Sequence, residues 1–167
     1  PDYHQPRSTI SVSLKQLAYT VKKLEAEGLE CLFLGGAGTG TYYFDGAICV
    51  YNEIQCRSYI FIDVDYQRIL DEEGNCISEF ENSLFVYTSV MSHTKSDIAI
   101  CDAGLKALSV DSGLPKIYGR DNLEYIKCSD EHGVITDPDG VLQLNDKLKL
   151  IPGHCDPTCN LFDWYVG

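Results

Sequence analysis

The chain has 167 residues, of which 44% are hydrophobic and 23% charged, so it can bury a core and is too apolar to be disordered. Its net charge of −12 repels nucleic-acid phosphates and anionic lipid. No apolar run approaches the length of a membrane span, so we expect neither a nucleic-acid nor a membrane partner.

Residues 11–27 are predicted to form a helix. Their apolar side chains recur at the spacing that makes one stripe along a helix. Ser13 and Gln16 have the S-x-x-Q pattern of a capping box, and Gly28 is the kind of residue that ends a helix. The stripe consists of Leu14, Leu17, Ala18, Val21 and Leu24.

An apolar run at 29–34 predicts a buried strand, and residues 35–41 then form a glycine-rich segment. Glycines let backbone N–H groups converge on an anion, and threonine hydroxyls add donors. A P-loop is excluded because the segment has no lysine, and a Rossmann loop because residues 41–46 do not resemble a helix. The phosphate cup of a (β/α)8 barrel and a plain turn remain as alternatives.

From about residue 47 the pattern changes to short runs rich in Val, Ile, Tyr and Phe, which predict an antiparallel β-domain, a barrel or a sandwich. We therefore expect an α+β chain with one domain segment at 1–46 and another at 47–167. A short helix is predicted at 64–71. The predicted strands are 47–51, 58–63, 83–91, 97–101, 133–136, 140–144 and 147–151, and the turn signals are 73–75, 111–113 and 137–140.

The pattern His154-Cys155-Asp156 follows the last predicted strand. In an extended chain residues two apart point the same way, so His154 and Asp156 can meet one cation while Cys155 points elsewhere. Imidazole plus carboxylate suits Zn²⁺ or Mn²⁺, and two protein ligands leave positions for water or substrate. The alternative is structural, with an aspartate bonded to the backbone before Pro157 and a histidine that caps the strand.

Three other clusters contain residues that could form a site. Tyr59 and Asp63 flank a predicted strand, where a tyrosine is more often core or rim than ligand-binding. Lys106 lies among carboxylates and is interpreted as a member of an ion pair. Residues 129–133 are interpreted as an exposed turn.

The eight cysteines are widely spaced and include no C-x-x-C pair. Small secreted disulfide scaffolds are shorter and richer in loops. We therefore expect reduced, buried thiols and a cytoplasmic protein. The cysteines are Cys31, Cys49, Cys56, Cys76, Cys101, Cys128, Cys155 and Cys159.

Five segments together resemble the C-terminal part of D-threonine aldolase, which shares a fold group with eukaryotic-type D-serine dehydratase and alanine racemase. Their order and spacing agree with that family. The segments are 35–45 (GGAGTGTYYFD), 52–63 (NEIQCRSYIFID), 101–115 (CDAGLKALSVDSGLP), 129–135 (SDEHGVI) and 151–166 (IPGHCDPTCNLFDWYV).

The resemblance implies a pyridoxal-phosphate enzyme of fold type III, the alanine-racemase-like type, in which a (β/α)8 barrel precedes a β-domain. Residues 1–46 would be the C-terminal end of the barrel with its phosphate-binding loop, and residues 47–167 the β-domain with the metal site. The cofactor-binding residues would be Gly36, Ala37, Gly38, Thr39 and Tyr42.

On the same resemblance, His154 and Asp156 would be the catalytic metal ligands for Mn²⁺ or Zn²⁺, with Mg²⁺ as a further alternative. The metal would polarise the β-hydroxyl of a D-3-hydroxy amino acid, and a base would take its proton. Cleavage of the Cα–Cβ bond would release glycine and an aldehyde, with the pyridine ring as electron sink. Related dehydratases have cysteine two residues after the histidine, so Asp156 favours the aldolase.

The chain departs from the family in three ways. Arg57 stands where the family usually has glycine, and Cys159 where it commonly has valine. The Schiff-base lysine lies early in the family's barrel, and no lysine here corresponds to it; Lys106 matches a different family lysine. The only methionine is the internal Met91.

We therefore expect a C-terminal portion of a longer lyase that is inactive without the N-terminal barrel half, and a homodimer by fold analogy. One alternative is a related D-serine or 3-hydroxyaspartate dehydratase. Another is a catalytically incompetent remnant that binds metal or phosphate.

Overall fold

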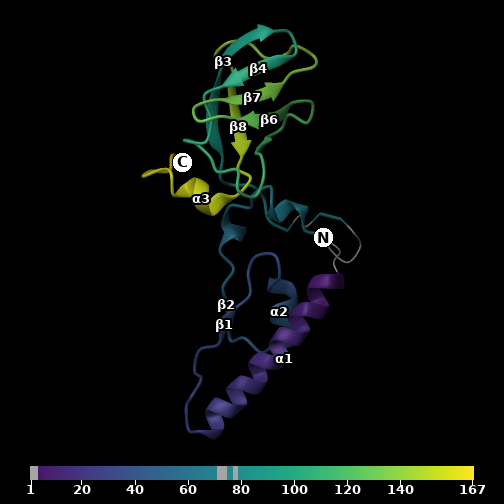
Figure 1. The fold of residues 1–167 in the computed structure, drawn as a ribbon, viewed down its shortest axis with the longest axis vertical. Helices are drawn as coiled ribbons and strands as arrows, with labels where there is room; N and C mark the ends of the chain where they lie inside the picture. The colour runs from purple at the N-terminus through teal and green to yellow at the C-terminus, as the bar shows by residue number, and fades with distance from the viewer. Residues whose placement is uncertain (1–3, 71–74, 77–78) are drawn as a thin grey trace. The chain divides into compact units, whose positions relative to one another are not determined.

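The computed structural model describes residues 4–70, 75–76 and 79–167, and the chain divides into two compact units (Figure 1). The first comprises Pro1–Ile60 and Tyr66–Glu79, and the second comprises Phe61–Asp65 and Phe80–Gly167. The boundary predicted near residue 46 falls inside the first unit. The assignment of residues 1–46 and 47–167 to two domains of a longer protein stays a prediction.

The first unit begins with helix α1 (His4–Ala26), which confirms the predicted helix and starts earlier than predicted. Leu14 is its most buried apolar residue, at 2% exposure. The capping box was wrong, because Ser13 lies inside the helix and its hydroxyl donates to the backbone oxygen of Thr9. Gly28 ends the helix as predicted, in the left-handed conformation at φ +79°.

The strand predicted at 29–34 was wrong. Leu29, Leu32 and Phe33 are 57%, 68% and 82% exposed, and only β1 (Gly35–Gly36) is a strand. It pairs in parallel with β2 (Glu53–Ile54) alone. A buried parallel strand needs partners on both edges and cover on both faces, and the described part of this unit supplies neither for this run.

The strand predicted at 47–51 was wrong, because helix α2 (Tyr42–Ile48) ends inside it and no strand follows there; α2 also corrects the inference that residues 41–46 are not helical. The helix forms although its aromatic residues favour strands, and its buried residue is Asp45, at 5% exposure. The 3₁₀ turn η1 (Ser58–Ile60) stands where a strand was predicted at 58–63.

A second 3₁₀ turn, η2 (Tyr66–Arg68), lies within the helix predicted at 64–71. Residue 71 and the first two residues of the turn signal at 73–75 lie outside the described residues.

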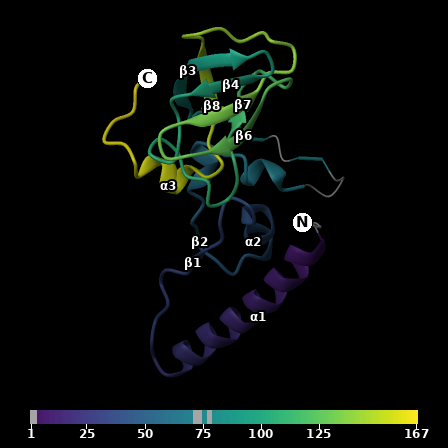
Figure 2. The same ribbon diagram turned by 45° about the horizontal axis from the view of Figure 1, so that its top comes forward.

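The second unit contains an antiparallel six-stranded sheet in the order β5-β8-β3-β4-β7-β6. The terminal strands β5 and β6 contact each other, so the sheet nearly closes into a barrel, and Figure 2 shows the strands curving round a shared interior. The predicted antiparallel β-domain is thus confirmed as a barrel. The strands are β3 (Val86–Lys95), β4 (Ile98–Cys101), β5 (Lys116–Ile117), β6 (Glu124–Cys128), β7 (Gly133–Thr136) and β8 (Lys147–Ile151).

Strand β3 joins the two halves of this barrel. Its first four residues pair with β8, from Val86 opposite Leu150 to Ser89 opposite Lys147. From Val90 onward it pairs with β4, with register shifts at two places. Such irregularities bend a strand, so one long strand can serve both halves of a closing sheet.

Four of the predicted strands in this unit correspond to β3, β4, β7 and β8, the last two with the predicted bounds. The strand predicted at 140–144 was wrong, because the carboxylate of Asp137 takes the backbone N–H groups of Val141 and Leu142. Strands β5 and β6 were missed. The first has only two residues, and charged residues interrupt the apolar pattern of the second.

Tyr125 is the largest of the fully buried side chains. Its hydroxyl donates a 2.7 Å hydrogen bond to the backbone oxygen of Ala103. Its ring lies against Gly133, where an added Cβ would come within 2.1 Å of the ring. The aromatic ring thus takes the place of a side chain on β7. The core around it contains Val86, Val90, Ala99, Cys101, Leu108, Ile117, Leu123, Ile135, Leu142, Leu148 and Leu150.

Replacing Tyr125 by phenylalanine is expected to destabilise the second unit by about 1 to 2 kcal/mol, because the Ala103 carbonyl loses its buried donor. Tyr87→Phe is the matched control, since that side chain is 66% exposed, and it should change stability by less than about 0.5 kcal/mol. Urea unfolding of both variants measures the difference, and equal values would contradict the role given to this hydrogen bond.

All eight cysteines are free thiols. Cys101 and Cys155 are buried as expected, whereas Cys49 and Cys76 are exposed. In the described part of the chain, no helix has the length and apolar character needed to cross a membrane.

Candidate metal centre and phosphate-binding loop

His154 and Asp156 lie where β8 is followed by the short helix α3 (Cys155–Cys159). His154 occupies the N-cap position with an extended backbone, at φ −146° and ψ 125°. The N–H of Cys155 donates to Oδ2 of Asp63 at 2.8 Å, and Asp63 is fully buried. A carboxylate from an earlier segment therefore fixes the start of this helix.

The side chains of His154 and Asp156 converge. Nε2 of His154 lies 3.4 Å from Oδ2 of Asp156, while Cys155 between them is 2% exposed. Burial raises the pKa of the Cys155 thiol, so the thiol stays protonated. The predicted convergence is present, although a helix start and not an extended strand produces it.

Asp111 completes this group from a distant loop. Its Oδ2 lies 2.7 Å from Nδ1 of His154, and its Oδ1 accepts a 2.6 Å hydrogen bond from the hydroxyl of Ser109. These hydrogen bonds, Ser109 first and His154 second, lower the pKa of Asp111 to about 2. The carboxylate is therefore ionised at neutral pH.

Burial alone would lower the pKa of His154, but the hydrogen bond to Asp111 and the charges of Asp111, Asp63 and Asp156 raise it. The imidazole lies among carboxylates, a setting that favours a positive charge or a bound cation. Asp111 was not predicted as a site residue, since 43 residues separate it from His154 and the sequence indicated only a turn and a carboxylate near Lys106.

Two glycines bring the loops of Asp111 and His154 together. A Cβ added at Gly153 would lie 2.0 Å from the backbone oxygen of Gly113, so glycine is required for this approach. Thr158 bridges the same loops, since its hydroxyl donates to the backbone oxygen of His154 at 2.7 Å and accepts from a backbone N–H of the Asp111 loop at 3.1 Å.

The pair His154 and Asp156 fits a divalent cation. Metal bonds of about 2.1 Å to nitrogen and oxygen, set at a tetrahedral angle, require donor atoms about 3.4 Å apart. Nε2 and Oδ2 have this separation, and the other ring nitrogen binds a carboxylate, as in most metal-ligating histidines. Among the described residues, no three His, Cys, Asp or Glu side chains are placed to hold one metal ion together, so the pair would leave open coordination positions.

The glycine-rich loop lies in the first unit. Ala37 is left-handed at φ 66°, and among the described residues no acceptor takes the backbone N–H of Ala37, Thr39 or Gly40. Thr39 is 4% exposed, and its Oγ1 accepts the N–H of Tyr59 at 3.0 Å, which leaves its own O–H able to donate. Unpaired N–H groups and a hydroxyl are the donors that a phosphate needs.

Other loop residues have structural contacts. A Cβ at Gly36 would lie 2.4 Å from the ring of Tyr51, and Gly38 donates its N–H to the hydroxyl of Thr41 at 3.3 Å. The hydroxyl of Tyr42 lies 3.4 Å from a carboxylate oxygen of Glu79. Burial first, and then the charge of Glu79, raise the pKa of Tyr42. This acidic neighbour gives Tyr42 no support as a phosphate contact.

The remaining sequence candidates are mostly exposed, and one of them forms an ion pair. Lys106 forms an exposed ion pair with Glu131, as predicted. Residues 129–132 of the predicted exposed turn are exposed, whereas Gly133 is buried and begins β7. Arg57 is exposed. Tyr59 is 41% exposed.

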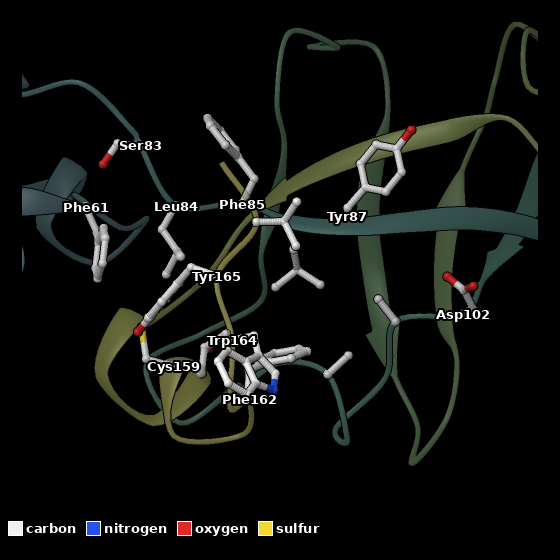
Figure 3. A pocket seen from close by; sticks show the side chains of 15 residues that line it. Phe61, Ser83, Leu84, Phe85, Tyr87, Asp102, Cys159, Phe162, Trp164 and Tyr165 are labelled. Carbon is white, nitrogen blue, oxygen red and sulfur yellow. The ribbon is translucent and has the colours of Figure 1, made fainter.

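The second unit also has an apolar pocket of about 640 Å³ (Figure 3). Aromatic side chains dominate its wall, and neither His154 nor Asp156 lines it. Its one carboxylate, Asp102, already accepts hydrogen bonds from Thr88 and Ser89. The pocket therefore lacks the convergent polar groups that orient a small polar substrate.

A nearly closed antiparallel barrel of this kind occurs in alanine-racemase-like proteins. An alanine-racemase-like protein from Idiomarina loihiensis has the same fold over 93% of this chain and 46% of its own, with a TM-score of 0.70 and 23% identity. Residues 83–167 match the serine dehydratase domain, and the chain belongs to that family.

Two aldolases are similar over almost the whole chain. The 3-hydroxy-D-aspartate aldolase of Paracoccus denitrificans (strain Pd 1222) is 58% identical over 99% of this chain and 43% of its own length. The crystal structure of D-threonine aldolase from Filomicrobium marinum has a TM-score of 0.88 and 37% identity over 98% of this chain and 44% of its own. The resemblance to D-threonine aldolase is confirmed, and the chain spans less than half the length of these relatives.

Proposed function

We propose that this chain supplies the metal-binding and phosphate-binding parts of a cytoplasmic aldolase-type lyase. The lyase cleaves a D-3-hydroxy amino acid between Cα and Cβ into glycine and an aldehyde. The observation that carries the proposal is the 3.4 Å convergence of His154 Nε2 and Asp156 Oδ2 in a chain so similar to two aldolases.

His154 and Asp156 would hold Mn²⁺, Zn²⁺ or Mg²⁺ through one nitrogen and one oxygen. Such a cation supplies Lewis acidity that makes a coordinated β-hydroxyl easier to deprotonate. The two residues come from one short segment that the buried Asp63 anchors through Cys155. The chain thus holds both ligands on one anchored segment, which favours the orientation of a substrate hydroxyl.

The N–H groups of Ala37, Thr39 and Gly40 and the hydroxyl of Thr39 would bind the phosphate of pyridoxal phosphate. This cofactor supplies an electron sink for the charge left on Cα when the carbon–carbon bond breaks. Lys106 is exposed and forms an ion pair with Glu131, so we do not assign it as the Schiff-base lysine. That lysine would come from a barrel half outside this chain, and the assembled enzyme would be a dimer.

A chimera tests the proposal. This chain replaces the matching 167 residues of the Paracoccus denitrificans aldolase, and the product is assayed with pyridoxal phosphate, Mn²⁺ and 3-hydroxy-D-aspartate or D-threonine. Formation of glycine and aldehyde is expected, and His154→Ala or Asp156→Ala should reduce it at least 100-fold, in line with loss of a metal ligand. Asp121→Asn, an exposed aspartate, is the control.

An active chimera whose His154 and Asp156 variants keep full activity would refute the metal site. A dehydratase is the second candidate, because the family that matches residues 83–167 is named for dehydration. It would release a keto acid and ammonia in place of glycine and an aldehyde, so product analysis separates the two functions.

A further inference from the structure

The geometry around His154 indicates a role for Asp111. An imidazole ligand offers a metal only the ring nitrogen that carries no proton, and the partner of the other nitrogen decides which one that is. Here Nδ1 lies 2.7 Å from Oδ2 of Asp111, with the hydroxyl of Ser112 farther away at 3.4 Å, and Nε2 faces Asp156. A carboxylate only accepts hydrogen bonds, and the contact of Nδ1 with Asp111 is shorter than the 3.4 Å contact of Nε2 with Asp156, so Asp111 favours the ring with its proton on Nδ1.

Asp111 is itself held in place. The hydroxyl of Ser109 donates to its Oδ1 at 2.6 Å, and the N–H of Ser109 donates to Thr158 at 3.1 Å. Thr158 in turn donates to the backbone oxygen of His154 at 2.7 Å. These bonds and the 2.7 Å contact of Asp111 with His154 close a ring, so carboxylate and imidazole cannot move apart independently.

We propose that Asp111 is a positioning residue. It holds neutral His154 as the Nδ1–H tautomer and thereby presents the free electron pair of Nε2, together with Asp156, to a divalent cation. The part of this inference that concerns metal binding rests on the proposed function, whereas the tautomer of His154 is a property of the chain alone.

The effect on metal binding is tested by titrating the full 167-residue chain with Mn²⁺ and measuring the free ion by electron paramagnetic resonance. Asp111→Asn keeps the shape of the side chain but brings an amide that can donate to Nδ1. It is expected to weaken Mn²⁺ binding 10- to 100-fold, the usual effect of losing such a partner. Ser109→Ala keeps the carboxylate and should weaken binding less, and Asp121→Asn should leave it unchanged.

The tautomer is read directly from long-range ¹H–¹⁵N correlation spectra of the metal-free chain at alkaline pH, where the ring is neutral. His154→Gln identifies the signals of His154. The wild type is expected to show the proton on Nδ1, and Asp111→Asn to shift it toward Nε2. If Asp111 did not control the ring proton, its replacement would leave the tautomer unchanged, and the same spectra show whether each variant is folded.

The outcomes separate the two proposals. If the wild type binds Mn²⁺ no better than His154→Ala, the proposed metal site fails and the Asp111 inference fails with it. If the wild type binds through His154 and Asp156 but Asp111→Asn binds equally well, only the role of Asp111 is overturned. A wild-type tautomer with the proton on Nε2 would also overturn it.

Discussion

Replacing Gly153 by alanine is expected to destabilise the second unit by about 3 kcal/mol and to weaken Mn²⁺ binding more than tenfold. The new Cβ would lie 2.0 Å from the backbone oxygen of Gly113. A backbone carbonyl cannot rotate aside as a flexible side chain can, so one of the two loops must shift. The shift separates Asp111 from His154, whose 2.7 Å contact depends on this close approach.

Gly119→Ala is the control for this substitution. Gly119 is left-handed at φ +69°, but nothing lies within 4 Å of its added Cβ. It should therefore cost only the left-handed strain, about 1 kcal/mol, with Mn²⁺ binding intact. Hydrogen exchange of β3 and β8 amides, measured by mass spectrometry, reports the stability of this unit. Equal protection and equal Mn²⁺ affinity in the two variants would contradict the packing role of Gly153.

Replacing Asp137 by alanine is expected to cost about 3 kcal/mol or more. Asp137 is fully buried, and its two oxygens accept the backbone N–H groups of Val141 at 3.0 Å and Leu142 at 2.8 Å. Nε2 of His93 lies 3.1 Å from Oδ2. Alanine leaves both N–H groups without an acceptor, and each buried donor left without a hydrogen bond costs about 1 to 3 kcal/mol of stability.

The charge of Asp137 also gives a pH dependence. Burial alone would raise its pKa, but the N–H groups of Leu142 and Val141 and the nearby His93 lower it. A carboxylate whose pKa is lower in the folded state stabilises the protein at pH values above its unfolded-state pKa of about 3.9. This stabilisation is lost as the pH falls through the folded-state pKa. The gap between wild type and Asp137→Asn, about 2 kcal/mol at pH 7, should therefore narrow below about pH 4.

Urea unfolding at pH 7 and at successively lower pH measures this gap. Asp139→Asn is the control, because Asp139 lies in the same loop but is exposed, with Asn122 as its side-chain partner. It should match the wild type at every pH. A gap between wild type and Asp137→Asn that stays constant down to pH 2 would show that the buried carboxylate contributes no pH-dependent stability.

The sequence predicted local features best where a single element decided them. The apolar stripe and Gly28 predicted α1, and the alternation of residues 147–151 predicted β8, because these patterns reflect the face that each element buries. Prediction failed where partners decide the outcome. Residues 29–34 have the composition of a buried strand but lack neighbouring strands to pair with. Residues 140–144 do not form a strand, because the carboxylate of Asp137 accepts hydrogen bonds from their backbone N–H groups.

By itself, the sequence determined the class of chain, an acidic α+β protein with a β-domain, and the pattern that places His154 and Asp156 two residues apart. Only the tertiary structure decided that Asp111 faces His154. That contact depends on the approach of two backbones at Gly113 and Gly153 and on the bridge through Thr158. Contacts between residues about forty positions apart follow from how strands and loops pack, and no local pattern in the sequence records them.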